Sequence, residues 1–344
     1  MKISPPVYNV ALNGLGRVGR SLLRLAVRRA DFNVVAVNDL NDDAASLAYA
    51  LNYDSTYGTL PEKFTGSDSA LGISGRRIKI LNEPDVAAVS WSSLGADIVI
   101  DASGVRANSL KLKAAADSHR LARAFITHFS ADADLVLTLG CNEADYRASL
   151  HRTIASNTCD ATAIAPVLTA LGRVAPVEDV SLAILHPWLN HQNLLDGRPP
   201  EDAGCGFELG RAAWGNVIPK MTSAEPAIRA VLPSLKNLSA LSYRIPTPIV
   251  ACADVTVRFS GDVTRERVLE GLKRHQSESR FKILGFNREP LVSADFKGDE
   301  YSATLEERLL TVQGGLCKFA IWYDNEAGYA ARVLDQVQFC ESRA

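Results

Sequence analysis

The sequence lacks any long apolar run: no stretch reaches the roughly 18 consecutive apolar residues that a membrane-spanning helix requires. Its first residues, MKISPPVYNVALNG, also lack the apolar core of a signal peptide. No excess of one charge is present either, because the formal net charge is −2. A basic field that would attract nucleic acid is therefore missing. We expect a cytoplasmic protein that contacts neither membrane nor nucleic acid.

Closely spaced cysteine pairs are also missing. The six cysteines are spread along the chain without a C-x-x-C motif: Cys141, Cys159, Cys205, Cys252, Cys317 and Cys340. That spacing argues against a structural zinc site and against a disulfide framework. It fits a chain that works in the reducing cytosol, so we expect neither a metal nor disulfides.

What the sequence does contain is enough apolar material for a large core. It has 344 residues, of which 47% are hydrophobic and 22% are charged. A chain of this length suggests two domains. Its strand-like and helix-like segments alternate in the first half, which predicts an α/β protein.

A glycine-rich turn joins the first expected strand to the first expected helix. The strand covers Tyr8–Leu12, and Gly14, Gly16 and Gly19 follow it in a G-x-G-x-x-G pattern. A second apolar run, NVVAVNDL, ends at Asp39. Strand, glycines, helix, strand and terminal acid in one unit predict a dinucleotide-binding fold.

Each glycine has a physical task in such a fold. Gly14 permits the tight turn, Gly16 lets the backbone approach a pyrophosphate, and Gly19 lets the helix pack on the strand. Asp39 is placed to bind a ribose 2′-hydroxyl and would repel a 2′-phosphate, which favours NAD over NADP. The alternative is a strand-to-helix turn without a ligand.

Two further apolar runs, ADIVIDASG and RAFITHFS, predict parallel strands that are buried on both faces. Their C-terminal ends lie at Ser103, Gly104 and Thr127. Because the carboxyl ends of parallel strands meet at one edge of a sheet, we expect these three residues at the same crevice as the glycines.

The stretch TIASNTCDATAIAPVLTAL places a cysteine at the start of an expected helix. Cys159 follows the turn-forming segment 156–158, and the apolar helical face behind it consists of Ile164, Val167, Leu168 and Leu171. Gly172 is expected to close this helix, and Pro166 to kink it or to shift its start. The unpaired N–H groups of a first helical turn lower the pKa of a thiol, so Cys159 is a candidate nucleophile.

A candidate base comes from the segment DVSLAILHPW. Its period-two alternation places His186 on the same strand face as Val180, Leu182 and Ile184. A cysteine and a histidine can be partners in covalent catalysis, although distance along a sequence does not establish the pairing. Taken singly, Cys159 fits a small buried apolar residue, and His186 fits a satisfied core histidine.

The remainder of the chain predicts an antiparallel sheet and a closing helix. The segment ADVTVRF alternates apolar and polar residues, as a strand with one covered face does. The final segment, LCKFAIWYDNEAGYAARVLDQVQF, predicts a strand, a turn at Asp324 and Asn325, and a helix. Tyr329, Val333 and Val337 share one face of that helix.

Several segments, in this order and spacing, resemble one family. They are NGLGRVGR, VVAVNDL, LNYDSTYG, SNTC, RIPTP, LVSADF and WYDNEAGY, and they are spread over nearly the whole chain. The family is that of glyceraldehyde-3-phosphate dehydrogenase. The resemblance implies a Rossmann NAD-binding domain over residues 1–157, an α+β catalytic domain with a largely antiparallel sheet over 158–323, and a C-terminal helix over 324–344 that returns to the first domain. It also implies NAD, a phosphorylated aldehyde substrate and a homotetramer.

By the same resemblance, Cys159 is the nucleophile and His186 the base that activates it. The thiolate attacks an aldehyde to give a thiohemiacetal, hydride passes to the nicotinamide, and a thioester remains. The implied cofactor-binding residues are Asn13, Gly14, Gly16, Arg17, Val18, Gly19, Asn38, Asp39, Ser103, Gly104, Thr127, Asn325 and Tyr329. The implied substrate- and phosphate-binding residues are Thr158, Asp160, Arg211, Thr222, Ser223 and Arg244.

The chain departs from the family pattern around the nucleophile. Asp160 stands where the family carries a hydroxyl residue that helps to bind inorganic phosphate. Two like charges about 4 Å apart repel by about 4 kcal/mol at an effective dielectric constant of about 20, so Asp160 would weaken phosphate binding. It also disfavours the thiolate. Leu189 and His191 replace a threonine and an aspartate of the family, Lys220 is a candidate new anion contact, and the loop at 196–210 is longer.

These departures leave three functions open. The first is NAD-dependent oxidation of a phosphorylated aldehyde with transfer of the acyl group to phosphate. The second is hydrolysis of the thioester by a water that Asp160 orients, as in the relative erythrose-4-phosphate dehydrogenase. The third, from another class, is a catalytically retired NAD-binding interaction protein, and the retention of Cys159 and His186 argues against it.

Overall fold

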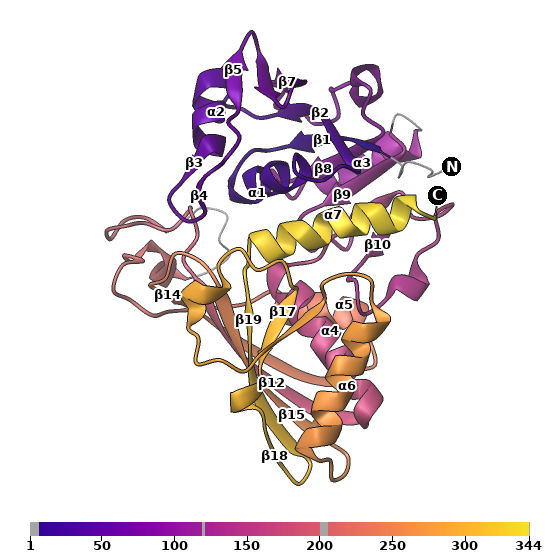
Figure 1. Ribbon diagram of the computed structural model, residues 1–344, viewed down its shortest axis with the longest axis vertical. Helices are drawn as coiled ribbons and strands as arrows, with labels where there is room; N and C mark the ends of the chain where they lie inside the picture. Colours follow the sequence, from indigo (N-terminus) through magenta and orange to yellow (C-terminus); the bar gives the residue numbers. More distant parts are fainter. Residues whose placement is uncertain (1–6, 119–120, 200–205, 344) are drawn as a thin grey trace. The chain divides into compact units, whose positions relative to one another are not determined.

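A computed structural model describes residues 7–118, 121–199 and 206–343. The chain divides into two compact units, each with its own sheet (Figure 1). The first unit contains residues up to 137, residues 144–157 and residues from 333 onward. The second contains residues 138–143 and 158–332. Part of the longer loop at 196–210, including Cys205, lies outside the described residues.

The first unit is built on a nine-stranded sheet with the order β10-β11-β9-β8-β1-β2-β7-β6-β5. Neighbours from β10 to β7 are parallel, and the last two pairs are antiparallel. The strands are β1 (Tyr8–Asn13), β2 (Phe32–Asn38), β5 (Thr65–Ser67), β6 (Ala70–Ile73), β7 (Arg76–Leu81), β8 (Ile98–Asp101), β9 (Arg123–Ile126), β10 (Leu135–Val136) and β11 (Thr153–Ala155). A separate hairpin pairs β3 (Tyr53–Asp54) with β4 (Gly58–Thr59).

Helices cover this sheet because its central strands are apolar on both sides. Every residue of β8 and of β9 is buried. Helix α1 (Arg17–Ala26) packs on β1 and β2, α3 (Asn108–Asp117) packs on β9 and β11, and α2 (Ala44–Asn52) contacts β5 and β6. The predicted strand, glycine turn, helix and strand of the nucleotide-binding unit are therefore confirmed as β1, α1 and β2.

The second unit is built on an eight-stranded sheet with the order β13-β14-β12-β15-β19-β17-β16, and β18 pairs with β19. Among the strand pairs that the structure describes in this second sheet, only β12–β14 and β16–β17 are parallel. The predicted, largely antiparallel sheet is thus confirmed. The strands are β12 (Val177–Pro187), β13 (Ile218–Lys220), β14 (Asn237–Ile245), β15 (Ala251–Phe259), β16 (Leu284–Asn287), β17 (Ala303–Glu306), β18 (Thr311–Gln313) and β19 (Leu316–Tyr323).

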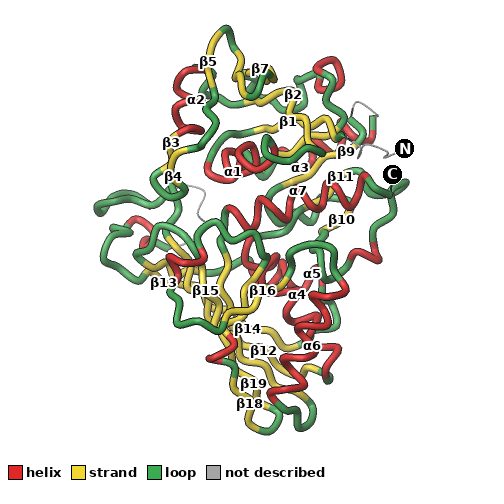
Figure 2. The backbone as a smooth tube through the Cα atoms, viewed as in Figure 1, coloured by secondary structure: helices red, strands yellow, loops and turns green. Residues whose placement is uncertain are grey.

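Three helices gather beside this second sheet (Figure 2). They are α4 (Cys159–Val174), α5 (Ala224–Val231) and α6 (Arg265–Glu278). Helix α4 contacts α5 and α6, and it also contacts β12 and β17. The inward residues of β12 are Val180, Leu182, Ile184 and His186, and all four are buried, as the alternation predicts.

Helix α4 runs further than the sequence predicts. It ends at Val174 and continues through Gly172, so the expected end at Gly172 is wrong. A glycine inside a helix costs only about 1 kcal/mol, and here the bond from the Ala175 amide to the Leu171 carbonyl still forms. Pro166 is buried inside the helix and does not shift its start, which is Cys159.

The last helix, α7 (Ala327–Glu341), has residues in both units. Its final turns hold to the first unit through two ion pairs, Arg29 with Asp335 at 2.7 Å and Arg123 with Glu341 at 2.6 Å. Tyr329, Val333 and Val337 are buried, which confirms the predicted apolar face.

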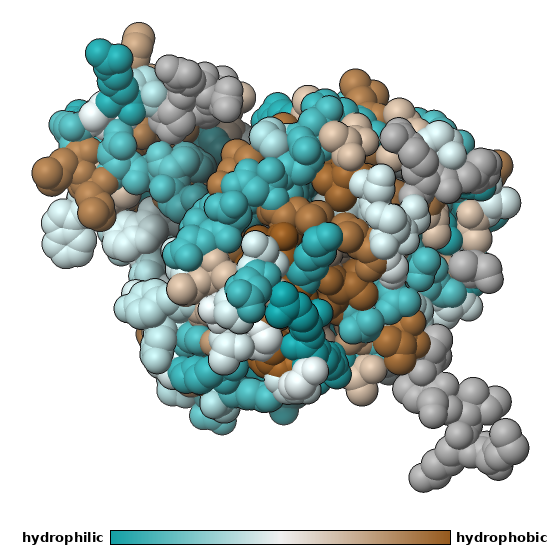
Figure 3. Space-filling view, turned by 90° about the horizontal axis from the view of Figure 1, so that it is seen from above, coloured by the Kyte–Doolittle hydropathy of each residue, from teal (hydrophilic) through white to brown (hydrophobic). Residues whose placement is uncertain are grey.

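The surface carries apolar side chains between polar ones (Figure 3). Exposed apolar residues are normal on folded proteins and mark no site by themselves. Among the helices of the described residues, none combines the length and the apolar character needed to cross a membrane.

The glycine turn between β1 and α1 yields a stability prediction. A Cβ at Gly19 would clash with the carbonyl oxygen of Gly14, whereas a Cβ at Gly16 would meet no atom within 4 Å. We expect Gly19→Ala to lower the free energy of unfolding by about 1–3 kcal/mol or more, and Gly16→Ala by less than about 1 kcal/mol. Thermal unfolding followed by circular dichroism measures the difference, and equal midpoints would contradict this description of the turn.

Candidate active site

The start of α4 is fixed by the two residues before it. Asn157 adopts a left-handed backbone with φ of 65°, a conformation that asparagine tolerates better than most residues. Thr158 is then the N-cap, and its hydroxyl accepts a hydrogen bond from the Ala161 amide at 3.1 Å. Cys159 therefore becomes the first residue of the helix, beside its unpaired N–H groups.

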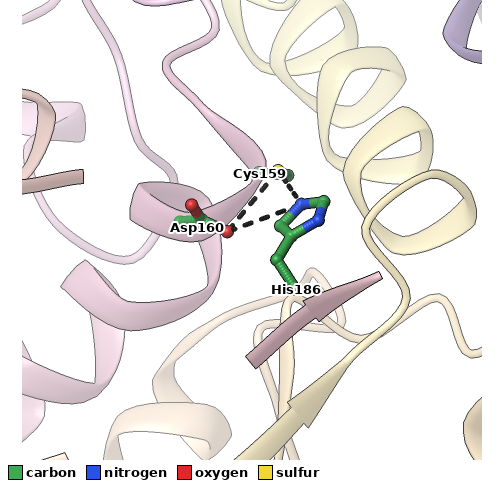
Figure 4. A group of neighbouring side chains, drawn as sticks. All are labelled: Cys159, Asp160 and His186. Carbon is green, nitrogen blue, oxygen red and sulfur yellow. Dashed lines mark hydrogen bonds and ion pairs between the residues drawn. The ribbon is translucent and has the colours of Figure 1, made fainter. Parts of the chain in front are cut away.

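His186 reaches Cys159 from the end of β12 (Figure 4). Its Nε2 lies 3.6 Å from the Cys159 sulfur, and its Nδ1 lies 2.7 Å from the carbonyl oxygen of Pro187. A carbonyl oxygen can only accept a hydrogen bond, so Nδ1 carries the proton and its N–H donates a hydrogen bond to the Pro187 carbonyl. The neutral ring then presents an unprotonated Nε2 to the thiol. The predicted pairing of Cys159 with His186 is thus present in the second unit.

Asp160 completes a close cluster with these two residues. Its Oδ1 lies 3.7 Å from the Cys159 sulfur and 3.9 Å from Nε2 of His186. The same oxygen accepts a hydrogen bond from the Tyr323 hydroxyl at 2.7 Å. Tyr323 is the last residue of β19, so this strand of the second sheet holds the carboxylate of Asp160 in place.

Burial dominates the electrostatics of the cluster. It raises the pKa of the Cys159 thiol well above its ordinary value, and the Asp160 charge raises it further. The Asp160 amide lowers the thiol pKa, as the helix start predicts, but burial outweighs this effect. Burial, together with the positive charge of Arg244, lowers the pKa of His186 to about 4. Both shifts favour the neutral forms of the pair, a thiol and an unprotonated imidazole.

Asp160 acts in opposite directions on the two groups. It disfavours a thiolate on Cys159, and it favours an imidazolium on His186. The two distances from its Oδ1 are nearly equal, 3.7 and 3.9 Å. Because Coulomb energy depends on distance, the two effects nearly cancel when a proton moves from the sulfur to the ring. Asp160 therefore opposes an isolated thiolate much more than it opposes the thiolate–imidazolium pair.

Arg244 supplies a cation to the same cluster. It is paired in register with His186 across strands β14 and β12, and only 7% of its surface is exposed. Its charge lowers the pKa of both Cys159 and His186. Its Nε is buried and has no hydrogen-bond partner among the described residues. A buried guanidinium with an unused donor is suited to an anionic group of a ligand.

The turn before α7 brings two more predicted residues into the second unit. Asp324 accepts hydrogen bonds from the amides of Glu326 and Ala327 and so caps the helix. Asn325 is 6% exposed, and its buried Oδ1 has no partner within the described part of the chain. Tyr329 is buried, and its pKa is raised first by burial and then by the charge of Cys159. An orphaned amide oxygen of this kind fits a carboxamide ligand.

In the first unit the predicted cofactor residues lie around the glycine turn. Gly14 has φ of 90°, and a Cβ there would come within 2.6 Å of the Ser103 backbone. Gly16 is exposed at the N-cap of α1 with open space beside it, as a close approach by pyrophosphate requires. Asp39 is half-buried at the end of β2 and accepts from the Leu15 amide at 2.6 Å. These residues fit NAD, although Asp39 also braces the turn itself.

Most of the other predicted cofactor residues are at least partly exposed. Ser103 and Gly104 are exposed after β8, while Thr127 and Val18 are half-buried. Arg17 forms an ion pair with Asp54 at 2.6 Å.

Asn13 and Asn38 are instead buried among other polar groups. The Asn38 amide donates to Asn13 at 2.7 Å, and the Asn13 amide donates to Asp101 at 2.7 Å. This chain of hydrogen bonds ties together the ends of β2, β1 and β8. The two asparagines therefore stabilise the ends of the strands from which the glycine turn begins.

The predicted phosphate contacts are only partly gathered at the cluster. Arg211 is exposed and pairs with Asp196 at 3.0 Å. Thr222 accepts from the Ala224 amide at 3.0 Å, and exposed Ser223 is the N-cap of α5. Burial lowers the pKa of His191, and the positive charges of Lys220 and Arg244 lower it further.

Comparison with known proteins decides the family. Residues 8–109 match the glyceraldehyde 3-phosphate dehydrogenase NAD binding domain, and residues 158–325 match the C-terminal domain of the same enzyme. The chain belongs to the glyceraldehyde-3-phosphate dehydrogenase family. The resemblance inferred from the sequence is thereby confirmed.

Relatives in this family match along almost their whole length. Glyceraldehyde-3-phosphate dehydrogenase 1 of Bacillus cereus is 32% identical over 339 residues, covering 97% of this chain and 98% of the relative. Glyceraldehyde-3-phosphate dehydrogenase of Kitasatospora aureofaciens is 35% identical over 339 residues, with 97% and 99% covered. Glyceraldehyde-3-phosphate dehydrogenase 1 of Bacillus subtilis is 35% identical over 332 residues, with 95% and 96% covered.

Sequence reasoning missed two groups that organise the cluster of Cys159, Asp160 and His186. Tyr323 positions the carboxylate of Asp160, and the Pro187 carbonyl selects the tautomer of His186. The alternation of β19 offers a signal for Tyr323, since Cys317, Phe319, Ile321 and Tyr323 are its buried residues. No sequence pattern marks a backbone carbonyl such as that of Pro187.

The electrostatics of the cluster predict how Asp160 controls the thiol. Replacement by asparagine removes the charge that raises the pKa of Cys159, so the thiolate should form at lower pH. We expect the pH midpoint of Cys159 alkylation by iodoacetamide to fall in Asp160→Asn. Peptide mass spectrometry across a pH series measures it. Asp254→Asn, whose carboxylate pairs with Lys318 on the surface, serves as the matched control, and an unchanged midpoint in Asp160→Asn would refute the assignment.

Proposed function

We propose that this chain is an NAD-dependent dehydrogenase that oxidises glyceraldehyde 3-phosphate or a closely related phosphorylated aldehyde. The observation that carries the proposal is the 3.6 Å approach of the Cys159 sulfur to the unprotonated Nε2 of His186. Family membership supports the substrate class, since the relatives are named for glyceraldehyde-3-phosphate dehydrogenase. NAD fits the glycine turn and Asp39 in the first unit, and it accepts hydride when bound.

In the first step, Cys159 becomes the nucleophile. Its proton moves to Nε2 of His186 while the sulfur attacks the aldehyde carbon, so one S–H bond breaks and one C–S bond forms. The carbonyl oxygen takes up the proton from the imidazolium, and the product is a neutral thiohemiacetal. Asp160 adds little to the barrier of the initial proton transfer, because it lies 3.7 Å from the sulfur and 3.9 Å from Nε2.

In the second step, Asp160 is favourable. The sulfur is now covalently bonded and neutral, and His186 again accepts a proton, this time from the thiohemiacetal hydroxyl as hydride leaves the carbon. The resulting imidazolium lies 3.9 Å from the Asp160 carboxylate, with no thiolate to offset the attraction. Asp160 thus stabilises the imidazolium formed in the oxidation step and contributes little to the activation of the thiol.

We assign the substrate phosphate to Arg244, whose buried Nε is without a partner among the described residues. Arg211, Thr222, Ser223 and Thr158 are further candidates for substrate and phosphate contacts. Asn325, with its orphaned Oδ1, is assigned to the nicotinamide carboxamide, with Tyr329 beside Cys159. The remaining proposed cofactor contacts are Gly14, Gly16, Arg17, Val18, Gly19, Ser103, Gly104 and Thr127, while Asn13 and Asn38 brace them.

The wider setting is also proposed from the family. Residues 1–157 would form the NAD-binding domain, 158–323 the catalytic domain and 324–344 the C-terminal helix. A homotetramer in the cytoplasm is the corresponding assembly and location.

Asp160 favours a second candidate function, hydrolysis of the thioester. Its carboxylate lies 3.7 Å from the sulfur that would carry the acyl group, and it is held by Tyr323. A charged oxygen there repels inorganic phosphate but can orient a water molecule. The product would be a free acid, as expected of a dehydrogenase for erythrose 4-phosphate or a similar sugar phosphate. A retired NAD-binding protein would instead form no NADH with any aldehyde.

Assays with and without phosphate separate these functions. NADH formation is followed with glyceraldehyde 3-phosphate and with erythrose 4-phosphate, in buffers that contain or lack inorganic phosphate. We expect NADH with at least one substrate, and a loss of about 10³-fold or more in kcat/KM for Cys159→Ser. Phosphate-dependent turnover indicates acyl transfer, and phosphate-independent release of the acid indicates hydrolysis.

Asp160→Thr tests the role of the carboxylate in the same assay. Removing the charge and restoring a hydroxyl should lower the KM for inorganic phosphate by about tenfold or more. An unchanged KM for phosphate would contradict the proposed repulsion. NADH formation by native chain and Cys159→Ser at equal rates would refute the function as a whole.

A further inference from the structure

We propose that Cys159, Asp160 and His186 form a three-ligand site for a divalent cation of the zinc class, and that the bound cation reversibly blocks the nucleophile. Each of these residues offers one ligand atom, and the three atoms lie within 4.8 Å of one another. The inference is independent of the substrate proposed above, because it depends only on the three donor atoms and their supports.

The two separations from the sulfur are close to those of a tetrahedral site, and the separation between the imidazole nitrogen and the carboxylate oxygen is longer. Zinc bonds of about 2.3 Å to sulfur and about 2.0 Å to nitrogen or oxygen require roughly 3.5 Å between sulfur and its neighbours and roughly 3.3 Å between nitrogen and oxygen. The observed separations are 3.6 Å from sulfur to Nε2, 3.7 Å from sulfur to Oδ1, and 3.9 Å from Nε2 to Oδ1. Binding in tetrahedral geometry requires Nε2 and Oδ1 to approach each other by roughly 0.6 Å.

The residues behind the ligands also have the form found at metal sites. A metal-bound histidine usually donates its other ring N–H to a carbonyl or carboxylate, and His186 donates Nδ1–H to Pro187 at 2.7 Å. Metal-bound carboxylates are likewise hydrogen-bonded, and Tyr323 donates to Asp160 at 2.7 Å. Figure 4 shows the three ligand side chains converging on one another, and the Tyr323 hydrogen bond holds Oδ1, the same oxygen that faces the sulfur and Nε2.

The donor set selects the kind of cation. Sulfur, imidazole nitrogen and one carboxylate oxygen suit zinc or a similar borderline-soft ion, whereas magnesium and calcium prefer oxygen ligands alone. Once the thiol releases its proton to solvent, the thiolate and the carboxylate neutralise the two charges of the cation. Arg244 works against binding by its positive charge, so the affinity is set by the balance between these charges.

The consequence is a competition at the sulfur. A bound cation occupies the lone pair that attacks the aldehyde and the lone pair of His186 that accepts protons. A tetrahedral site with three protein ligands keeps a fourth position for water. The third ligand is Asp160, and the family pattern has a hydroxyl residue at this position. The proposed site therefore depends on a residue in which this chain differs from the family pattern.

Zinc binding to the full chain tests the proposal directly. Equilibrium dialysis followed by metal analysis should find one zinc per native chain, and Cys159→Ser should lose it. Asp160→Asn and Tyr323→Phe should weaken the affinity by about tenfold or more. Cys141→Ser and Asp254→Asn, which change a thiol and a carboxylate elsewhere, should bind as the native chain does. Circular dichroism confirms that each variant is folded.

Cobalt gives a second readout that does not depend on activity. Co²⁺ bound to the native chain should show a thiolate-to-cobalt charge-transfer band, and zinc should protect Cys159 from iodoacetamide. Both effects should weaken in Tyr323→Phe, which keeps all three ligands. Zinc binding that is equal in native chain, Cys159→Ser and Asp160→Asn would overturn the proposal, and so would the absence of a thiolate band in a cobalt-loaded native chain.

Discussion

The contact between the Cys159 sulfur and Nε2 of His186 is the interaction on which the proposed chemistry depends. It exists because helix α4 starts at Cys159 and His186 is the penultimate residue of strand β12, and both elements pack in the same unit. Thr158 fixes the first end through its capping hydroxyl, and the Pro187 carbonyl fixes the orientation of the imidazole. Burial favours the neutral form of each reactive group.

Asp160 changes what this contact can do. A carboxylate next to a nucleophilic sulfur would be expected to disable it, yet its nearly equal distances from sulfur and imidazole leave the proton transfer between them almost unaffected. The carboxylate favours the imidazolium of the later oxidation step, disfavours inorganic phosphate, and adds a third donor for a cation. One substitution at the helix start thus bears on the acyl acceptor and on metal sensitivity together.

Much of this arrangement could be predicted from the sequence because it follows from local patterns. The glycine spacing after β1, the alternation that buries His186, and the start of α4 at Cys159 are all periodic or positional signals. The rest depends on tertiary contacts. The hydrogen bond from Tyr323 to Asp160 joins residues 163 positions apart, and the burial that raises the thiol pKa is collective. The spacing of the cysteines does not predict the proposed cation site either. The three donor atoms of that site come from the start of a helix and the end of a strand, which lie far apart in the sequence.

The most direct test of the central claim is to trap the covalent intermediate. Native chain mixed with NAD and glyceraldehyde 3-phosphate in phosphate-free buffer is quenched in acid, digested and analysed by mass spectrometry. The account predicts an acyl group on the peptide that contains Cys159, formed in step with NADH. NADH formation while that peptide stays unmodified, or acylation at another residue, would contradict it.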